Sequence, residues 1–339
     1  MLNAQRLDYD GRICFDRLSN SCDVTRHEVS ELSEVSARCE GKEVVVNKEL
    51  PLPGDLIRGL PESVKLICEA GTGYNNIDID AAREKGIAVC NVPTYATEAM
   101  AHMAITYVMA LSCSLVPQAT ALAKGDRSYM RQVHLGNLPH FEVTGKTFGL
   151  IGGLGTIGLR VAQMSMALGM KVIVRDRGTA PLGLRADGIE VVSFDDLMTR
   201  SDFVSIHCPL NPQTRGLLDA AALSKMKPSA YLINTARGSI VDLPALVDAL
   251  KARAIAGAAL DVYGEGSAPP PALPDEHPLY GLDNVILTPH IGWQRLEARQ
   301  RVVDMCAANI EAFALGEPMN IDMATGRPRY TPTAKSMAS

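Results

Sequence analysis

The chain has 339 residues, 47% of them hydrophobic and 21% charged, a balance typical of a compact globular protein large enough for two domains. The net charge of −5 leaves no broad basic surface, which argues against a nucleic-acid partner. The eight cysteines are scattered without a CxxC pair, so we expect reduced core residues in the cytoplasm, with neither disulfides nor a metal site.

The first part of the chain alternates strand and helix signals. Short β-type runs occupy 13–15, 44–46, 65–68 and 87–90, and polar or amphipathic segments separate them. This pattern predicts a small parallel-sheet domain. The acidic N-terminal stretch has no apolar core segment, which argues against a targeting signal.

The next element is an apolar helix predicted over 100–111, and a polar stretch rich in Gly, Arg and His follows over 125–140. The longest apolar run, 99–116, contains His102, Ser112 and Ser114. These polar residues make it a poor membrane span, so we expect no membrane partner.

The strongest motif is Gly153-Leu154-Gly155-Thr156-Ile157-Gly158, directly after the apolar run 147–151. Glycines permit a tight turn and close approach of a phosphate, and the N–H groups at a helix start favour an anion. The run 171–174 predicts the next strand, and Asp176 ends it, where a carboxylate can bond an adenosine ribose. We therefore expect a dinucleotide-binding site.

The same alternation continues through the centre of the chain. Strands are predicted at 148–151, 172–174, 203–206, 231–233, 258–260 and 285–287, which fits a doubly wound nucleotide-binding domain. Asp242 is placed to cap a helix that has Pro244 in its first turn. An amphipathic helix follows Trp293, and the last residues, rich in Pro, Ser and Thr, predict a loose tail.

Several motifs in this order resemble the D-isomer-specific 2-hydroxyacid dehydrogenases, particularly the glycerate dehydrogenase and hydroxypyruvate reductase branch. The matching stretches are 71–78, 95–99, 149–158, 208–216, 234–238, 260–262 and 288–293. The resemblance spans most of the chain from about residue 71 to 313, whereas the first fifty residues match only in pattern.

This resemblance implies an α/β fold of two doubly wound parallel-sheet domains, with the nucleotide-binding (Rossmann) domain inserted in a flavodoxin-like substrate domain. The expected parts are a substrate domain over 1–113, a Rossmann domain over 114–294, a C-terminal helix over 295–325 that returns to the substrate domain, and a tail over 326–339. The active site is expected in the cleft between the two domains.

Two residues are expected to carry the chemistry. The resemblance implies that Arg237 binds the substrate carboxylate and polarises the ketone, since a guanidinium can pair two oxygens at once. His290 would exchange a proton with the carbonyl oxygen. The structural alternatives are a turn arginine and a loop histidine. His102, His207 and His277 lack such a setting and are expected to be packing or surface residues.

The carboxylate that orients the histidine departs from the family pattern. Relatives carry a Glu five positions after the Asp of Asp261-Val262, where this chain has Gly266, and Glu265 lies one residue earlier. Either the loop shifts so that Glu265 reaches His290, or the carboxylate is lost. We predict that Glu265 is the partner of His290.

Further contacts are implied by the resemblance. Thr72 and Gly73 lie in a turn that offers backbone N–H groups to the substrate carboxylate, and Asp261 is expected to face the nicotinamide carboxamide. The residues expected to contact the cofactor are Thr97, Gly153, Gly155, Thr156, Ile157, Gly158, Asp176, Pro209, Thr214, Thr235, Ala236 and Asp261. Ordinary turns and a helix cap are the alternative roles for Thr72, Thr97 and Thr214.

The choice of cofactor depends on the residues around Asp176. Its charge favours NAD, because it would repel a 2′-phosphate and bind the ribose hydroxyls. Arg175 and Arg177 flank it and could offer two cations to a phosphate, so NADP is the alternative. We predict NAD.

The resulting hypothesis is an oxidoreductase that transfers a hydride between NAD(P)H and a small 2-keto or 2-hydroxy acid, D-specific and of the hydroxypyruvate/glycerate or glyoxylate/glycolate type. The alternative is a non-catalytic, NAD-sensing corepressor of the same fold. A scaffold that uses formate or phosphite as hydride donor has only the fold in its favour. A homodimer is expected from the resemblance, through the helix at 100–111 and the segment after it.

Overall fold

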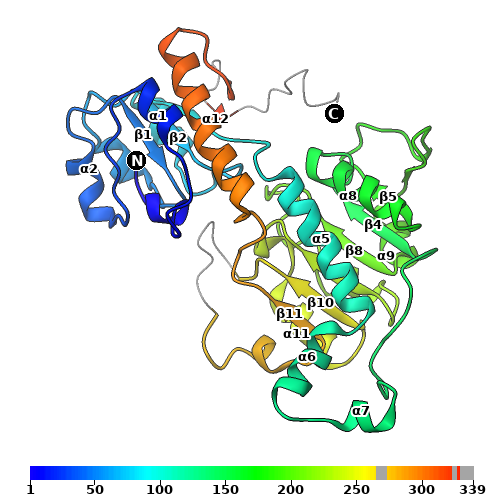
Figure 1. Cartoon of the computed structure of the whole chain (residues 1–339). Coiled ribbons are helices and arrows are strands. Elements are labelled where there is room, and N and C mark those ends of the chain that lie inside the picture. Colours follow the sequence, from blue (N-terminus) through cyan, green and yellow to red (C-terminus); the bar gives the residue numbers. More distant parts are fainter. Residues whose placement is uncertain (265–272, 323–326, 329–339) are drawn as a thin grey trace. The chain divides into compact units, whose positions relative to one another are not determined.

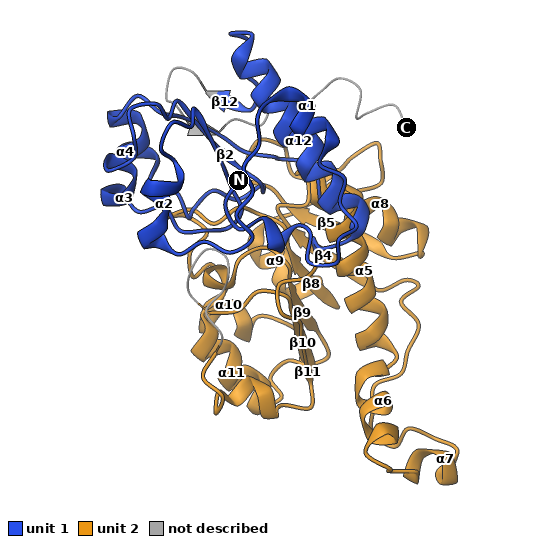
Figure 2. Ribbon diagram, turned by 60° about the vertical axis from the view of Figure 1, so that its left-hand side comes forward, with its two compact units in different colours: residues 1–96, 267–269, 293–339 blue, residues 97–266, 270–292 orange. Residues whose placement is uncertain are grey.

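The computed structural model describes residues 1–264, 273–322 and 327–328 (Figure 1). They form two compact units (Figure 2). Unit 1 comprises 1–96 and the described residues from 293 onward, and unit 2 comprises 97–264 and 273–292. Unit 2 is therefore inserted in the sequence of unit 1, as predicted. The expected domain boundaries at 113/114 and 294/295 stay predictions, and only 327–328 of the expected tail are described.

The sheet of unit 1 has three parallel strands in the order β1-β2-β3. They are β1 (Val44–Asn47), β2 (Leu66–Glu69) and β3 (Ala88–Cys90), and β2 is buried along its whole length. The expected strand at 13–15 is wrong. The backbone N–H groups there bond to side chains, from Ile13 to Asp8 Oδ1 and from Cys14 to Gln300 Oε1, both at 2.9 Å, so they are satisfied without a sheet neighbour.

Helices of unit 1 come from both ends of the chain. They are η1 (Ala4–Arg6), α1 (Asp16–Ser21), η2 (Leu32–Glu34), α2 (Val35–Arg38), α3 (Gly54–Arg58), α4 (Ile79–Glu84) and α12 (Leu296–Ala314), and a short hairpin adds β12 (Ile321–Asp322) and β13 (Arg327–Pro328). The buried Arg299 of α12 donates to Asp10 Oδ2 at 2.7 Å and to Leu7 O at 2.8 Å, and Asn309 donates to Asn91 O at 2.9 Å. The late helix α12 is thus bonded to the earliest part of the chain.

Unit 2 contains an eight-stranded sheet in the order β11-β10-β9-β8-β4-β5-β7-β6. Its strands are β4 (Thr147–Ile151), β5 (Lys171–Arg175), β6 (Gly183–Leu184), β7 (Glu190–Val191), β8 (Phe203–Ile206), β9 (Tyr231–Asn234), β10 (Gly257–Leu260) and β11 (Val285–Leu287). All pairings are parallel except that of β6 with β7. The six predicted strands are confirmed, and the predicted fold class of parallel-sheet α/β units holds.

Unit 2 also contains helices, most of them between successive strands of its sheet. They are α5 (Thr97–Ser112), α6 (Leu115–Ala123), α7 (Ser128–Gln132), α8 (Thr156–Ala167), α9 (Phe194–Arg200), α10 (Ala220–Ser224), η3 (Gly238–Ile240), α11 (Leu243–Lys251) and η4 (Pro278–Gly281). The predicted cap of α11 is confirmed: Asp242 accepts a hydrogen bond from Ala245 N–H at 3.1 Å, and Pro244 lies in the first turn.

Helices α6 and α7 form an arm that extends away from the sheet of unit 2 (Figure 1). Neither helix has a buried residue. The arm nevertheless exposes large apolar side chains, among them Leu115 (56%), Met130 (65%) and Val133 (88%). Within the described residues, no single helix meets the length and hydropathy needed to cross a membrane; α5 and α6 pass only as a pair bent by 68°.

Candidate active site

The turn after β4 contains the glycines of the predicted pyrophosphate site. Gly152, which the sequence motif does not include, has φ +81°. The residue with the left-handed backbone conformation is therefore Gly152 and not Gly153. A Cβ on Gly153 would stand 2.5 Å from Val174 Cγ1, and one on Gly158 would stand 2.6 Å from Gly152 O. Both positions therefore require glycine because strand, turn and helix pack too closely for a side chain.

Helix α8 begins at this turn, with Gly155 as its N-cap. Leu159 N–H donates to Gly155 O at 2.8 Å, the first bond of the helix, and Thr156 and Ile157 form its first turn. Gly155 is exposed, and a Cβ there would meet only Gly152 O within 4 Å. An accessible backbone at the positive end of a helix dipole fits a pyrophosphate, so these residues can hold a dinucleotide.

Asp176 directly follows β5, where the acid for the ribose was expected. Its Oδ2 accepts hydrogen bonds from Thr179 N–H (2.7 Å), Thr179 Oγ1 (2.6 Å) and Ala180 N–H (3.1 Å). Partial burial acts to raise the pKa of Asp176, but these donors hold it below its ordinary value. The carboxylate is therefore ionised at neutral pH, between a half-buried Arg175 and an exposed Arg177.

The segment after β8 carries two of the predicted cofactor contacts. Thr214 is buried, donates its hydroxyl to Pro209 O at 2.7 Å and accepts from Asn211 N–H at 2.9 Å. The hydroxyl therefore closes a turn, the structural role that was the alternative for this residue. The contacts of Pro209 and Thr214 with a cofactor stay predictions.

The loop after β9 holds Arg237. Asn234, at the end of the strand and 1% exposed, accepts from Ala236 N–H (3.0 Å) and donates to Arg237 O (2.9 Å). Thr235 is buried, and the half-buried Arg237 donates from its guanidinium to Ala236 O at 2.7 Å. The amide of Asn234 fixes the loop from both sides, a role that the motif did not reveal, although the residue lies within it.

The loop after β11 holds His290, whose φ of +56° is unusual for a residue with a side chain. Its N–H donates to Asp261 O (3.1 Å) and Thr288 O (3.0 Å). The Asp261 carboxylate is 0% exposed and accepts from Ile291 N–H (3.0 Å), Gly292 N–H (2.9 Å) and the Thr288 hydroxyl. Asp261 thus fixes the loop that presents His290, which the sequence did not predict.

A third side chain extends this network. The hydroxyl of Tyr107, on α5, hydrogen-bonds to Thr288 Oγ1, which in turn donates to Asp261 Oδ1. Tyr107 is 2% exposed, and burial, followed by the charge of Asp261, raises the pKa of its hydroxyl, which therefore stays protonated. This series of hydrogen bonds connects α5 with the His290 loop, which lie far apart in the sequence.

Strand register brings these loops to one edge of the sheet. In β10, Leu260 pairs with Asn234 of β9 and with Leu287 of β11, and all three strands are parallel. Arg237, Asp261 and His290 follow the ends of these three neighbouring strands. The carboxyl edge of a parallel sheet is where α/β proteins bind their ligands, so the structure supports the predicted convergence of cation and imidazole.

The remaining predicted residues lie elsewhere. In unit 1, the Thr72 hydroxyl donates to Val92 O (3.0 Å) and Asn91 donates to Thr72 O (2.7 Å), which holds the turn beside the half-buried Gly73. Thr97 is half-buried at the start of α5. Glu265 lies outside the described residues, so its pairing with His290 stays a prediction.

Two other histidines, His102 and His277, have surroundings that do not suggest a catalytic role. His102 is exposed on α5, and His277 caps η4 by accepting from Leu279 N–H at 3.3 Å. In the part of the chain that the structure describes, no three His, Cys, Asp or Glu side chains are grouped so that they could hold a metal ion, and the eight cysteines are free thiols.

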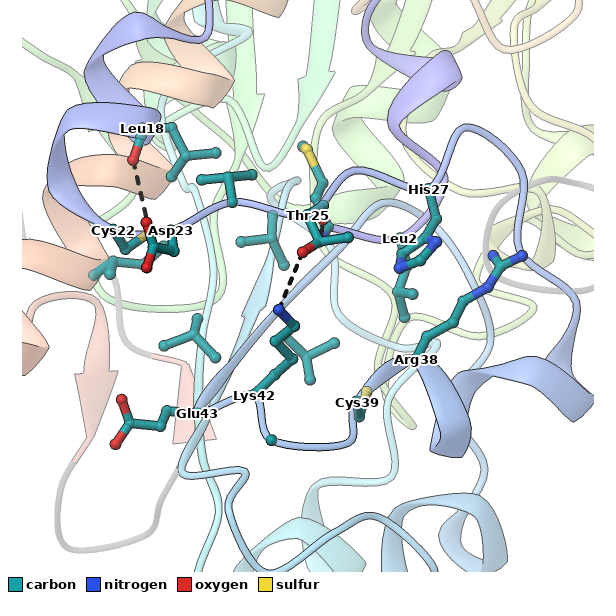
Figure 3. Close-up of a pocket in the computed structure, with 17 residues that line it drawn as sticks. Leu2, Leu18, Cys22, Asp23, Thr25, His27, Arg38, Cys39, Lys42 and Glu43 are labelled. Atoms are coloured by element: carbon teal, nitrogen blue, oxygen red, sulfur yellow. Dashed lines mark hydrogen bonds between the residues drawn. The ribbon is translucent and has the colours of Figure 1, made fainter.

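A separate cavity of about 340 Å³ lies in unit 1 (Figure 3). It contains none of the predicted site residues. Its polar groups include Lys42 Nζ, which donates to Thr25 Oγ1 at 3.1 Å, and Cys22 Sγ, which donates to Leu18 O at 3.6 Å. These groups bond within the protein, so the cavity gives no reason to assign a ligand.

Comparison with known proteins places this geometry in a family. Residues 105–292 match the family described as D-isomer specific 2-hydroxyacid dehydrogenase, NAD binding domain. A hydroxypyruvate reductase of Blautia hydrogenotrophica is 32% identical over 320 residues, which cover 94% of this chain and 96% of that protein. A glycerate dehydrogenase of Methylorubrum extorquens is 37% identical over 290 residues, covering 85% and 88%.

Solved structures give the same result. The D-isomer specific 2-hydroxyacid dehydrogenase of Lactobacillus delbrueckii ssp. bulgaricus, in its NAD complexed form, has a TM-score of 0.76 and 30% identity over 94% of this chain and 97% of that one. An acyclic imino acid reductase in complex with NADPH and D-Arg has a TM-score of 0.80 and 29% identity, covering 91% and 94%. The chain belongs to the D-isomer-specific 2-hydroxyacid dehydrogenases and is an oxidoreductase of 2-hydroxy acids that uses a nicotinamide cofactor.

Proposed function

We propose that this enzyme reduces a small 2-keto acid of the hydroxypyruvate or glyoxylate type to the D-2-hydroxy acid, and catalyses the reverse oxidation. The observation that supports it is the placement of Arg237, Asp261 and His290 after three neighbouring strands. The hydroxypyruvate reductase and glycerate dehydrogenase named above support this substrate class, and the relatives and structures named above give no support to the corepressor alternative.

We assign each residue a role in the reaction from the chemistry of its side chain or backbone. When bound, the nicotinamide cofactor supplies or accepts the hydride. Arg237 pairs its guanidinium with the substrate carboxylate and the ketone oxygen, and the N–H groups of Thr72 and Gly73 bind the same carboxylate. His290 gives a proton to the carbonyl oxygen in reduction and takes one from the hydroxyl in oxidation. Asp261 holds the His290 loop, and Glu265 is the proposed carboxylate partner of His290.

We propose NAD as the preferred cofactor, held by the α8 turn and by Asp176, with further contacts from Thr97, Thr235 and Ala236. The ionised Asp176 carboxylate would repel a 2′-phosphate, although Arg175 and Arg177 flank it. Initial rates with equal concentrations of NADH and NADPH test this, and a clear preference for NADPH would overturn it. In Asp176→Ala the preference for NADH should fall.

The proposed reaction is tested by a substrate panel. We expect purified enzyme to oxidise NADH with hydroxypyruvate and glyoxylate faster than with pyruvate or phenylpyruvate. A protein that binds NADH but turns over none of the four acids would not be the proposed reductase. Chiral analysis of the product tests D-specificity, since an L-product would contradict the assignment.

We also propose that the enzyme is a cytoplasmic homodimer. The apolar side chains on the α6–α7 arm support a dimer, because exposed large side chains such as Leu115, Met130 and Val133 are costly to leave in water. The eight free thiols agree with a reducing compartment. Light scattering should give a dimeric mass that becomes monomeric in the double variant Met130→Ser, Val133→Ser; a monomeric wild type would contradict the proposal.

A further inference from the structure

Unit 1 encloses a lysine and a glutamate to which the proposed reaction gives no role. Lys48 and Glu69 expose 0% and 1% of their surface. Charged side chains are almost never so completely buried unless they are paired, because removing a charge from water is costly. Both follow or end strands of the unit 1 sheet, Lys48 directly after β1 and Glu69 at the end of β2.

The lysine ammonium contacts a carboxylate and an aromatic ring. Its Nζ donates to Glu49 Oε1 at 2.8 Å and lies 3.7 Å from the centroid of the Trp293 ring. Trp293 is 4% exposed and meets the buried Tyr95 edge-on, with ring centroids 6.4 Å apart. A cation over a desolvated indole is held by the negative face of the ring, so Lys48 is fixed in place.

The same ammonium lies behind the turn that is proposed to receive the substrate. A Cβ built on Gly71 would stand 3.8 Å from Lys48 Nζ and 3.6 Å from Glu69 Oε1. Gly71 directly precedes Thr72 and Gly73. Within the described residues, no protein group accepts a hydrogen bond from the backbone N–H of Thr72 or Gly73. These donors remain available to an anion.

The charges around the turn do not cancel. Glu49 accepts a second charged bond, from Arg6 at 2.6 Å, so two cations share its carboxylate. Glu69 accepts from Asn47 (2.7 Å) and Asn76 (3.0 Å), and burial raises its pKa to about 7, so it is partly protonated at neutral pH. The Glu49 carboxylate is thus shared by two cations, which leaves the Lys48 ammonium incompletely neutralised beside Gly71.

We propose that Lys48 is a positioning residue of the substrate site: its buried ammonium places positive charge behind the Gly71-Thr72-Gly73 turn and strengthens the binding of the substrate carboxylate there. The inference rests on the proposed function, in which this turn receives the carboxylate. In a poorly solvated region such a charge acts at several ångströms without contact. It selects monoanionic keto acids over uncharged ketones.

The test removes the charge and keeps the volume. Lys48→Met should raise the Kd of oxamate, measured by calorimetry on the enzyme with bound NADH, and the KM of hydroxypyruvate by about tenfold. The kcat and the Kd of NADH should stay within about threefold, since Lys48 does not take part in chemistry or cofactor binding. Lys65→Met is the matched control, because Lys65 is exposed in the same unit and its ammonium donates to Glu62 O, a backbone carbonyl.

A second variant is expected to change the Kd of oxamate in the opposite direction. Glu49→Gln removes negative charge from the cluster and leaves Lys48 in place, so the Kd of oxamate should fall about threefold. A merely structural role for Lys48 predicts no tighter binding in this variant. Since Trp293 is the single tryptophan, its fluorescence shows whether each variant keeps the ring environment.

The outcomes separate the two proposals. If wild type turns over hydroxypyruvate while Lys48→Met leaves both the oxamate Kd and the KM unchanged, the role of Lys48 is wrong and the proposed function stands. If Lys48→Met does not fold, unchanged or weaker oxamate binding in Glu49→Gln refutes it. If wild type neither binds oxamate nor reduces any 2-keto acid, the proposed function fails, and the inference with it.

Discussion

The ends of β8 and β11 each carry a histidine at the carboxyl edge of the same sheet, yet the two side chains have different surroundings. The Nε2 atom of His207 is buried and has no hydrogen-bond partner among the described residues. Burial lowers the pKa of His207 to about 4. His290 is half-buried, as His207 is, but lies in a loop whose backbone is held by Asp261 and Thr288.

The difference shows that position on the edge does not give a histidine its role. An imidazole that stays neutral from about pH 4 upward cannot donate a proton near neutral pH, so His207 is suited to packing. His290, the proposed acid–base, sits in a loop whose backbone is bonded to Asp261 and Thr288. Substitutions at His290, His207 and Tyr107 should therefore differ in what they change: catalysis, stability and the support of the His290 loop.

Replacing the proposed acid–base should have the largest effect. His290→Gln should lower kcat by about 10²–10⁴-fold, because an amide cannot supply the proton that the carbonyl oxygen needs. The Kd of NADH should be unchanged, and His102→Gln, at an exposed histidine of α5, should retain wild-type kcat. A kcat of His290→Gln within threefold of wild type would remove His290 from the mechanism.

His207, whose Nε2 atom is buried, should instead affect stability. The folded-state pKa of His207 lies below the unfolded value of about 6.5, so the unfolded chain binds more protons as the pH falls. Stability is complete above about pH 6.5 and is lost between there and about pH 4, by up to about 3 kcal/mol. Urea unfolding across this range should show a weaker pH dependence in His207→Gln.

The control for this measurement is the exposed His134, where a Gln substitution should leave the pH dependence as in wild type. Wild-type stability that is level from about pH 7 to pH 5 would contradict the burial of a neutral His207. The kcat of His207→Gln at neutral pH should stay close to wild type, which is the direct contrast with His290.

The smallest effect is expected at the hydroxyl that supports the His290 loop. Tyr107→Phe removes the bond to Thr288 and should cost about 1 kcal/mol of stability, with a few-fold loss of kcat because the loop is held less firmly. Tyr231→Phe is the matched control, since Tyr231 is also buried and its hydroxyl bonds to none of the described residues. A Tyr107→Phe enzyme with wild-type kcat would show that the Asp261 bonds alone hold the loop.

Much of unit 2 could be predicted from sequence because its signals are local. Apolar runs mark the buried parallel strands, and Asp242 with Pro244 marks a helix start. Strands β6 and β7 were not predicted, because each has two residues and so short a segment shows no hydrophobic periodicity. The run at 13–15 resembles a strand because Ile13 and Phe15 are buried on either side of the exposed Cys14, although the run pairs with no strand among the described residues.

The site residues could be predicted only where they lie in sequence motifs. Arg237 and His290 lie in motifs, but the bonds of Asn234, Tyr107 and Asp261 depend on which loops the sheet brings together. Lys48 gave one weak signal, a run of polar residues directly after an apolar strand. Its contact with Trp293 joins distant parts of the sequence, and no local pattern encodes it.

The bonding of α12 to the first residues of the chain has a consequence for synthesis. Val302, Val303 and Cys306 of this helix are 0% exposed, so the core of unit 1 is incomplete until the helix has left the ribosome. Unit 2 has its whole sequence available earlier, and domains generally fold as units during translation. We therefore expect the inserted unit 2 to fold first during translation. Until α12 is synthesised, the N-terminal segment stays incompletely folded, and its apolar strands are accessible to chaperones.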